Sequence, residues 1–424
     1  MFSDTISNRI FTSVVLLVFI ETICGSYSIP KNDMSTISIF YVIAGVLMAF
    51  LMMIKIRATT PSVSTGFERV FRWSHLIFLL FLTYSCVPII QKYLVDIPID
   101  FHNADMIPVL KIQAQRFLNF ENVYNDIVMW KSEKPIYLTF MWLPFSISEF
   151  FKFDARWIPL LWTLIGVFFL AKMSHRAKLL LPSVLGIFSV YSIFNFMITQ
   201  DKNTVIWAEE GVVVGYYIFL GYALSRKNAW LIGLGVAFCL LSRYFLVFWL
   251  PVFWLYWYFF QSKKSAWIIL ITSLSILFLT FLIPYGFKNA YFFLGQHNGY
   301  IEMAQRSWND NPNFTLQTLG FAKFFNFKSI EFLHQFLIVS SALISIVCGG
   351  LFLKFRSKKW FQPEMFALCS LKLTMICFYN LLEMPFYYLF YTNTFFSYCL
   401  LFHYLNLAES VPSSEVSEKS MSYE

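Results

Sequence analysis

The sequence predicts an all-α integral membrane protein with about 12 transmembrane helices, since a helical span needs about 20 apolar residues. Of its 424 residues, 58% are hydrophobic and only 13% are charged. Soluble domains average about 45–50% apolar and about 25% charged residues. The long apolar runs follow one another along nearly the whole chain. Runs of this length indicate helices rather than the short strands of a membrane barrel.

The positions of the basic residues predict which loops face the cytoplasm. The formal net charge is +8, but the lysines and arginines form short clusters between apolar runs. This pattern marks cytoplasmic loops and does not indicate a nucleic-acid partner. Both chain ends are then expected in the cytoplasm. The seven cysteines lie within apolar runs without paired spacing, which predicts neither a disulfide framework nor a zinc site.

The spans are expected to alternate in direction along the chain. The N-terminal run is expected to be a retained helix, because no small-residue cleavage site follows it. The expected spans are 10–28, 36–54, 73–90, 157–171, 180–199, 206–224, 230–241, 245–260, 266–283 and 331–353, followed by two more. Residues 410–424 are low in apolar residues, which predicts a disordered cytoplasmic tail.

The first large outer loop, residues 91–156, is expected to hold two amphipathic interfacial helices. Residues 135–151 are not a full span, because a crossing there would invert every later basic cluster. A first surface helix is predicted from Ile107, with apolar residues at helical spacing and Lys111, Gln113 and Arg116 opposite them. Asp105 stands at the N-cap position of this helix. The loop therefore frames an acidic segment at the outer surface.

Four segments of this loop carry a family resemblance. They read A-D-M-I-P-V-L (104–110), Q-R-F-L (115–118), K-P-I-Y-L-T-F-M-W-L-P-F (134–145) and F-D-A-R-W (153–157). The order resembles the first outer loop of the GT-C superfamily, integral-membrane glycosyltransferases that use polyprenyl-phosphate sugars. It is most similar to the bacterial mannosyltransferase-like branch. The acidic doublet frequent in that superfamily is missing, since Asp96, Asp100 and Asp105 are spaced by four and five.

The resemblance implies a GT-C-like enzyme of the bacterial inner membrane whose site faces the periplasm. It implies a lipid bilayer, a polyprenyl-phosphate donor that carries a sugar such as mannose, and a glycan, lipid or protein acceptor. The chain then divides into two N-terminal helices and a basic loop (1–72), a catalytic unit (73–409) with outer loops at 91–156 and 284–330, and the tail.

The chemistry points to the acids of the first loop. Moving a sugar to a hydroxyl requires a carboxylate that takes the proton and a positive charge beside the leaving phosphate. Asp105 is the first candidate for the general base, and helix capping alone is the alternative. Asp100 is the second candidate, and a solvated loop acid is its alternative. No cofactor is required by the sequence, but His102, Asp100 and Asp105 could hold a divalent metal.

Arg243 is the leading substrate-binding candidate. It stands in C-L-L-S-R-Y between two runs that are short for spans, so it is expected in the outer half of the membrane region. There it would bind the donor phosphate; snorkelling or a structural ion pair is the alternative. The weaker binding candidates, each with a structural alternative such as a solvated face or a helix terminus, are His102, Lys111, Arg116, Glu209, Glu210, His297 and Arg306.

Two other functions fit a polytopic chain. A secondary transporter would show repeated halves and interrupted helices that meet near the midplane, whereas the polar residues here gather on the outer face. A non-catalytic partner in assembly or lipid carriage is the other alternative, and the acids around Asp105 argue against it. Glu21 and Lys372 lie inside expected spans, where they pair either with each other or with backbone.

Overall fold

The computed structural model describes most of the chain. The described residues are 4–26, 34–60, 80, 84–85, 87–88, 91–92, 94–102, 104–128, 132–133, 135–174, 180–199, 207–287, 301–310, 315–325, 329–407 and 409–412. Most of the expected span 73–90, the binding candidate His297 and the tail after 412 lie outside them.

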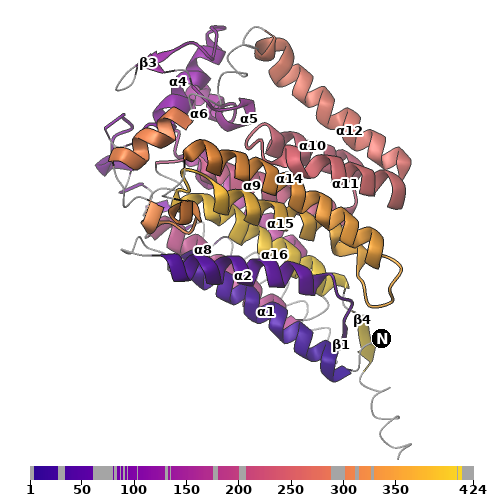
Figure 1. The fold of residues 1–424 in the computed structure, drawn as a ribbon. Helices are drawn as coiled ribbons and strands as arrows, with labels where there is room; N and C mark the ends of the chain where they lie inside the picture. Colours follow the sequence, from indigo (N-terminus) through magenta and orange to yellow (C-terminus); the bar gives the residue numbers. More distant parts are fainter. Residues whose placement is uncertain are drawn as a thin grey trace, which may run out of the picture.

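A bundle of long helices makes up the body of the molecule (Figure 1). The helices are α1 (Asp4–Ser26), α2 (Ser35–Met52), α7 (Trp157–Ser174), α8 (Leu180–Thr199), α9 (Glu210–Arg226), α10 (Ala229–Leu240), α11 (Leu246–Phe260), α12 (Lys263–Leu277), α14 (Ile330–Phe355), α15 (Phe366–Leu381) and α16 (Phe390–Leu407). A π-helix, η2 (Phe278–Gly286), continues α12.

Apolar length identifies the chain as an integral membrane protein. Six helical stretches of the described chain are long and apolar enough to cross a bilayer: Ser7–Ser26, Ser35–Met52, Trp157–Ser174, Lys263–Gly286, Ile330–Phe355 and Pro363–Leu381. Three shorter apolar helices are Val184–Ile198, Ala229–Leu240 and Leu246–Phe260. The expected helical membrane fold is confirmed at this level, and the total of about 12 spans stays a prediction.

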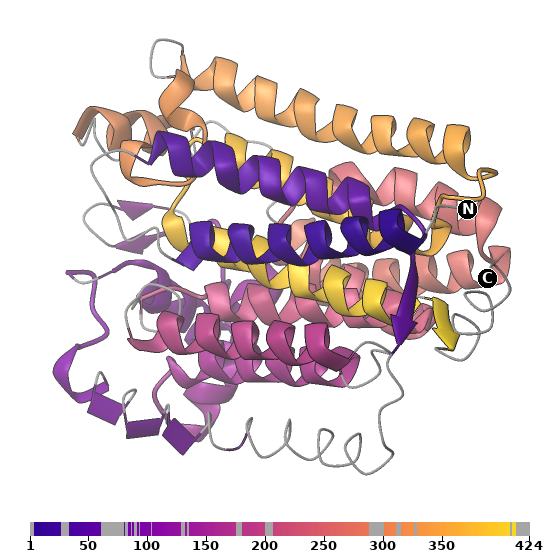
Figure 2. The same cartoon turned by 90° about the horizontal axis from the view of Figure 1, so that it is seen from below.

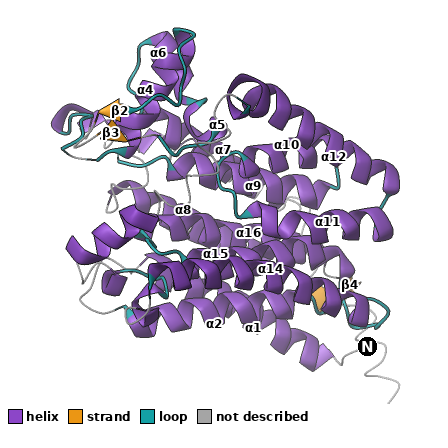
Figure 3. Ribbon diagram, turned by 45° about the horizontal axis from the view of Figure 1, so that its top comes forward, coloured by secondary structure: helices purple, strands orange, loops and turns teal. Residues whose placement is uncertain are grey.

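The two ends of the bundle differ. At one end, β1 (Arg57–Thr60) pairs in parallel with β4 (Glu409–Pro412), and the Tyr404 hydroxyl donates to the Ile54 carbonyl at 3.0 Å. We call this the basic end, because Lys172, Arg226, Lys263 and Lys354 stand at the adjoining helix ends. The opposite end, here the loop end, carries the first loop (Figures 2 and 3). Neither strand was predicted, because strand pairing between distant segments leaves no local signal.

The first loop forms α4 (Met106–Leu118), a two-stranded hairpin of β2 (Ile127–Val128) and β3 (Ser132–Glu133), α5 (Thr139–Trp142) and α6 (Phe145–Phe151). The first of the two expected helices is confirmed as a helix, and its place at the membrane interface stays a prediction. The second breaks into α5 and α6 at Pro144, whose ring removes a backbone donor. Gln113 was wrongly expected on the polar face. It lies three residues after Leu110, on the same side, and is fully buried.

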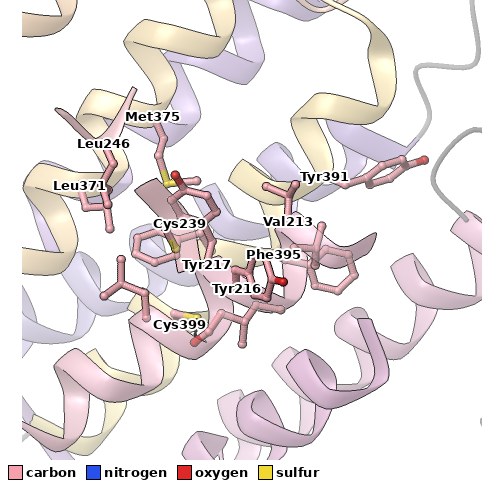
Figure 4. Close-up of a cluster of buried hydrophobic side chains, with 14 of the residues drawn as sticks. Val213, Tyr216, Tyr217, Cys239, Leu246, Leu371, Met375, Tyr391, Phe395 and Cys399 are labelled. Atoms are coloured by element: carbon pink, nitrogen blue, oxygen red, sulfur yellow. Dashed lines mark hydrogen bonds between the residues drawn. The ribbon is translucent and has the colours of Figure 1, made fainter. Parts of the chain in front are cut away.

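Short 3-10 helices connect the larger elements. They are η3 (Thr315–Gln317), η4 (Ala322–Phe325), η5 (Pro363–Met365) and η6 (Tyr387–Leu389). The largest buried cluster surrounds α9, which contributes Val213, Tyr216 and Tyr217 (Figure 4). Cys239 of α10, Leu246 of α11, Leu371 and Met375 of α15, and Phe395 and Cys399 of α16 join this cluster. Helix α9 is thus the central support of the bundle.

Glu21 and Lys372 form an ion pair inside the bundle. The Lys372 ammonium lies 2.5 Å from Glu21 Oε1 and donates to the Asn393 carbonyl at 2.7 Å, and both charged side chains are 0% exposed. Ser397 donates to the other oxygen of Glu21 at 2.7 Å. The sequence left open whether these residues pair with each other or with backbone. The structure shows both, because Lys372 donates to the Glu21 carboxylate and to a backbone carbonyl.

Lys372→Met should lower the unfolding free energy by about 3–5 kcal/mol, because it leaves the Glu21 carboxylate buried without its cation. Thermal unfolding of the detergent-solubilised protein measures this loss. The double variant Glu21→Gln/Lys372→Met removes both charges and should recover most of it. Equal unfolding temperatures for the single and double variants would show that the two charges are not coupled.

Candidate functional site

Arg243 lies between two buried carboxylates at the loop end. It belongs to the short turn between α10 and α11, where its amide donates to the Cys239 carbonyl at 2.8 Å. Its Nη2 lies 3.2 Å from Glu209 Oε1 and 2.8 Å from Glu210 Oε2. The carboxylates are 2% and 0% exposed and the Arg243 side chain is 21% exposed. The structural ion pair left open for Arg243 is therefore formed.

The two carboxylates differ in their remaining contacts. Glu210 uses its other oxygen to accept a hydrogen bond from the Thr392 hydroxyl of α16. Among the residues that the structure describes, Glu209 Oε2 is buried and has no hydrogen-bond partner, and the same holds for Arg243 Nε. Glu210 is thus held on two sides, whereas Glu209 and Arg243 each keep an unused polar atom.

Close packing of α9 on α7 fixes the position of this ion pair. Gly211 and Gly215 stand one turn apart at the start of α9, a spacing of small residues that lets membrane helices approach closely. A Cβ atom at Gly211 would overlap the Pro159 carbonyl oxygen, and one at Gly215 would lie 2.5 Å from that of Trp162. Larger residues there would push α9 away from α7 and move both carboxylates.

Asp105 of the first loop approaches the same cluster. It is partly buried at the N-cap position of α4, but its side chain makes no capping hydrogen bond. Its carboxylate lies within electrostatic range of Glu209 and of the phenols of Tyr137 and Tyr388. The neighbouring Met106 accepts a hydrogen bond from the Tyr388 hydroxyl at 3.1 Å, which holds the start of α4 beside η6. Helix capping therefore does not explain the position of the Asp105 carboxylate.

The pKa of the Tyr137 hydroxyl reflects the negative charges near it. Burial raises the pKa of its hydroxyl well above the usual range, and the nearby carboxylates of Glu209 and Asp105 raise it further. A phenol in this environment stays protonated and acts as a hydrogen-bond donor. In the described part of the chain, the carboxylates of Asp105, Glu209 and Glu210 share this region with the Arg243 guanidinium.

The other acids of the loop lie in more open positions. Asp100 accepts a hydrogen bond from the backbone amide of His102 at 3.0 Å in a tight turn, and the side chains of His102 and Asp96 are exposed. Within the described part of the chain, no group of three or more His, Cys, Asp or Glu residues is placed to hold a metal ion. The metal alternative for His102, Asp100 and Asp105 stays a prediction.

The described contacts of the remaining binding candidates are with groups other than the Arg243 ion pair. Lys111 lies 3.8 Å from the buried Glu149 carboxylate, which also accepts from Gln115 at 2.7 Å. Arg116 donates to the carbonyls of Asn125 and Asp126 at 2.5 and 2.8 Å, so it fixes the loop that follows α4. Arg306 lies on the helical stretch 301–310.

Several polar residues near the site were not candidates in the sequence. Thr392 and Tyr388 lie in an aromatic run that looks like ordinary membrane helix, and no local pattern marks them. His334 and Glu383 form a second buried pair at the loop end, with Nδ1 and Oε1 2.6 Å apart. Glu383 could have been identified from the sequence, because it is an acidic residue within an otherwise apolar segment.

An apolar groove of about 390 Å³ adjoins the site. It is lined by Phe140, Ile147 and Phe151 from α5 and α6, Trp162 from α7, Tyr216 from α9 and Phe238 from α10. The Phe140 amide donates to the Leu241 carbonyl at 3.1 Å, and Leu241 is two residues before Arg243. The groove and the charged cluster therefore meet at the turn between α10 and α11.

No protein-family model, curated protein or solved structure matches this chain.

Proposed function

We propose that this protein is a membrane glycosyltransferase that moves a sugar from a polyprenyl-phosphate donor to a hydroxyl acceptor. The observation that carries the proposal is that Asp105 lies within electrostatic range of Glu209, a member of the Arg243 ion pair, at the end of the bundle where this pair adjoins an apolar groove. A carboxylate, a cation and an apolar channel are the three parts that such a reaction requires.

The groove supports a donor that arrives within the bilayer. Its walls are apolar, and three side chains on or beside it are strongly exposed: Ile147 at 51%, Phe150 at 67% and Phe151 at 69%. Exposed apolar patches of this kind mark contact with lipid or with a partner. An isoprenoid chain lying in the groove would place its phosphate near Arg243.

The proposed reaction is a single displacement. The acceptor oxygen attacks the anomeric carbon of the donor sugar, and the bond from that carbon to the phosphate oxygen breaks. Asp105 takes the acceptor proton, and the polyprenyl phosphate leaves with the bonding electrons, so the anomeric configuration inverts. Arg243 offers positive charge to the phosphate, because its contacts to both carboxylates use Nη2 alone among its three nitrogens.

The proposed orientation of the chain in the membrane follows from the distribution of its basic residues. The basic end faces the cytoplasm by the positive-inside rule, which places both termini inside and Asp105 outside. In a bacterial inner membrane this outer face is periplasmic. The resemblance to the mannosyltransferase-like branch favours mannose as the sugar, and glycans, lipids and proteins are the acceptor classes.

A donor panel tests the proposal. The purified full-length chain in nanodiscs is incubated with acceptor glycosides and with polyprenyl phosphates that carry different labelled sugars. We expect acceptor-dependent release of polyprenyl phosphate from at least one donor. If the folded protein consumes none of them, the proposed activity is wrong.

Filling the groove should impair use of long-chain donors. Ser146 lines the groove and is 8% exposed, so Ser146→Phe places a ring where the isoprenoid would lie. Displacing two methylenes costs about 1.6 kcal/mol, which corresponds to an increase in donor KM of more than about tenfold. Short-chain donors should lose less. Leu161→Phe, at an exposed position of α7 that does not line the groove, is the matched control, and an equal effect in both variants would remove the groove from donor binding.

Transport remains the second candidate, because the Glu21–Lys372 pair lies in the bundle interior. Ionisable pairs inside membrane proteins often belong to ion or substrate pathways. Asn393 accepts from Lys372 through its carbonyl, and its neighbour Thr392 bonds Glu210, so the pair is linked to the site through α16. Uptake of the labelled donor into proteoliposomes without any chemical change would favour transport.

A further inference from the structure

We infer that Arg156 is a positioning residue, which holds the first-loop segment that carries Asp105 in register with the carboxylates of α9. The anchor is the start of α7, which contacts both parts. The effect of Arg156 on sugar transfer rests on the proposed function, whereas the anchoring contacts do not depend on it.

Arg156 is a buried cation that bonds the backbone of the first loop. Its side chain is only 3% exposed. Its Nη1 donates to the Ile97 carbonyl at 2.6 Å, and its Nη2 donates to the Leu94 carbonyl at 3.1 Å. These bonds join positions 59 and 62 residues apart in the chain. Arg156 therefore fixes the beginning of the loop against the start of α7.

Asp154 fixes the orientation of the Arg156 side chain. Asp154 Oδ1 accepts from Arg156 Nε and from the Arg156 backbone amide, both at 2.9 Å, and Oδ2 accepts from Nη2 at 2.7 Å. The paired carboxylate offsets the cost of burying the guanidinium, and the two-pronged contact sets the plane of the group. The other N–H groups are thereby aimed at the two loop carbonyls. A lysine ammonium lacks this planar geometry.

The same end of α7 also holds the start of α9. The Thr163 hydroxyl lies 2.8 Å from the Pro159 carbonyl oxygen and 3.2 Å from that of Gly211. Gly211 directly follows Glu210, and Arg156 precedes Pro159 by less than one helical turn. One short stretch of chain therefore binds the first loop on one side and the carboxylate-bearing end of α9 on the other.

Backbone contacts extend this register to Asp105. The Ala104 amide donates to the Asp100 carbonyl at 3.3 Å, which closes the turn before Asp105. The residue after Asp105 accepts a hydrogen bond from Tyr388. The segment is thus held on both sides, and Arg156 provides the attachment at its beginning. Displacing a reacting group by about 1 Å can lower a rate by about 100-fold.

The sequence F-D-A-R-W (153–157) receives a role from these contacts. A charged residue buried at the end of a membrane helix usually has a pairing or functional reason. Here the arginine pairs with the aspartate of the same motif and orders the loop that carries the proposed base.

Transfer kinetics of Arg156→Lys separate a positioning role from a purely structural one. The full-length variants in nanodiscs are assayed with the polyprenyl-phosphate donor that the wild-type protein uses. We expect kcat per folded protein to fall by about tenfold or more and the donor KM to stay within about twofold, because the base moves while the Arg243 ion pair and the groove remain. An unchanged kcat in folded Arg156→Lys would overturn the inference.

Two further variants make this measurement decisive. Asp154→Asn keeps an acceptor for Arg156 but weakens the pair, so it should show the same pattern at smaller size, and it decides the question if Arg156→Lys does not fold. Tyr404→Phe removes a hydrogen bond to a backbone carbonyl at the basic end and should keep the wild-type kcat.

A double-mutant cycle tests whether Arg156 acts through Asp105. Adding Arg156→Lys to Asp105→Asn should lower kcat by less than about twofold more, because the displaced group is no longer a base. Losses that multiply in the double variant would show that the two residues act independently, and this would overturn the inference.

Hydrogen–deuterium exchange measures the anchor without a transfer step. We expect amide exchange in residues 94–102 of Arg156→Lys to be faster by about fivefold or more, while α9 keeps its wild-type rates. Unchanged exchange in the folded variant would overturn the inference. Faster exchange in a protein that transfers no sugar from any donor would refute the proposed function and leave the anchoring role standing. Transfer at equal kcat by the wild type and Arg156→Lys would do the reverse.

Discussion

Asp105→Asn should reduce sugar transfer by at least about 100-fold, which is the usual contribution of a general base. The amide keeps the shape of the side chain but does not take a proton from the acceptor. Because the Asp105 side chain makes no capping hydrogen bond, the variant should unfold at nearly the wild-type temperature. The rate of polyprenyl phosphate release and the unfolding temperature are measured on the same preparation.

Asp96→Asn is the matched control for this prediction. Asp96 is an exposed acid of the same loop, so its replacement should leave the rate unchanged. Full activity in Asp105→Asn would remove Asp105 as the base. A simultaneous loss in Asp100→Asn would move that role to Asp100, the second candidate in the sequence.

Arg243→Ala should affect both stability and donor use. It leaves the Glu209 and Glu210 carboxylates buried without their cation, a change that typically costs about 3–5 kcal/mol. It also removes the positive charge proposed to face the donor phosphate. We therefore expect a lower unfolding temperature together with a higher donor KM and a lower kcat in the protein that remains folded.

Arg243→Lys separates these two effects. Lysine keeps the charge but lacks the planar group that contacts both carboxylates, so stability should recover more than activity. Unchanged donor KM and kcat in folded Arg243→Ala would show that the ion pair has a structural role only, even if the unfolding temperature of that variant falls.

Helix positions could be predicted from the sequence because spans depend on local apolar length. The run 180–199 coincides with α8, and the run 331–353 differs from α14 by only one or two residues at each end. The break of 135–151 at Pro144 was missed, because the charge rule constrained only the side of the membrane on which that stretch lies. The pairing of β1 with β4 joins segments far apart in the chain and has no local signature.

The charged residues of the site could be named but not paired from the sequence. Arg243 stood out because the runs around it are short, and the Glu209 and Glu210 doublet stood out at the start of a span. Their contact spans more than 30 residues and depends on how α9 packs against the α10–α11 turn. Thr392 is further still from Glu210 in sequence, so only the folded bundle reveals that it holds this carboxylate.

The most direct test of the proposed activity follows a labelled sugar through proteoliposomes. Polyprenyl-phosphate mannose, labelled in the sugar, is supplied with acceptor glycosides, and the products are identified by mass spectrometry and by the anomeric signal in NMR. We predict that the label moves to the acceptor with inverted configuration and that Asp105→Asn slows this transfer by at least about 100-fold. Label that changes membrane side while still bound to its lipid phosphate, at equal rates in both proteins, would contradict the proposed activity.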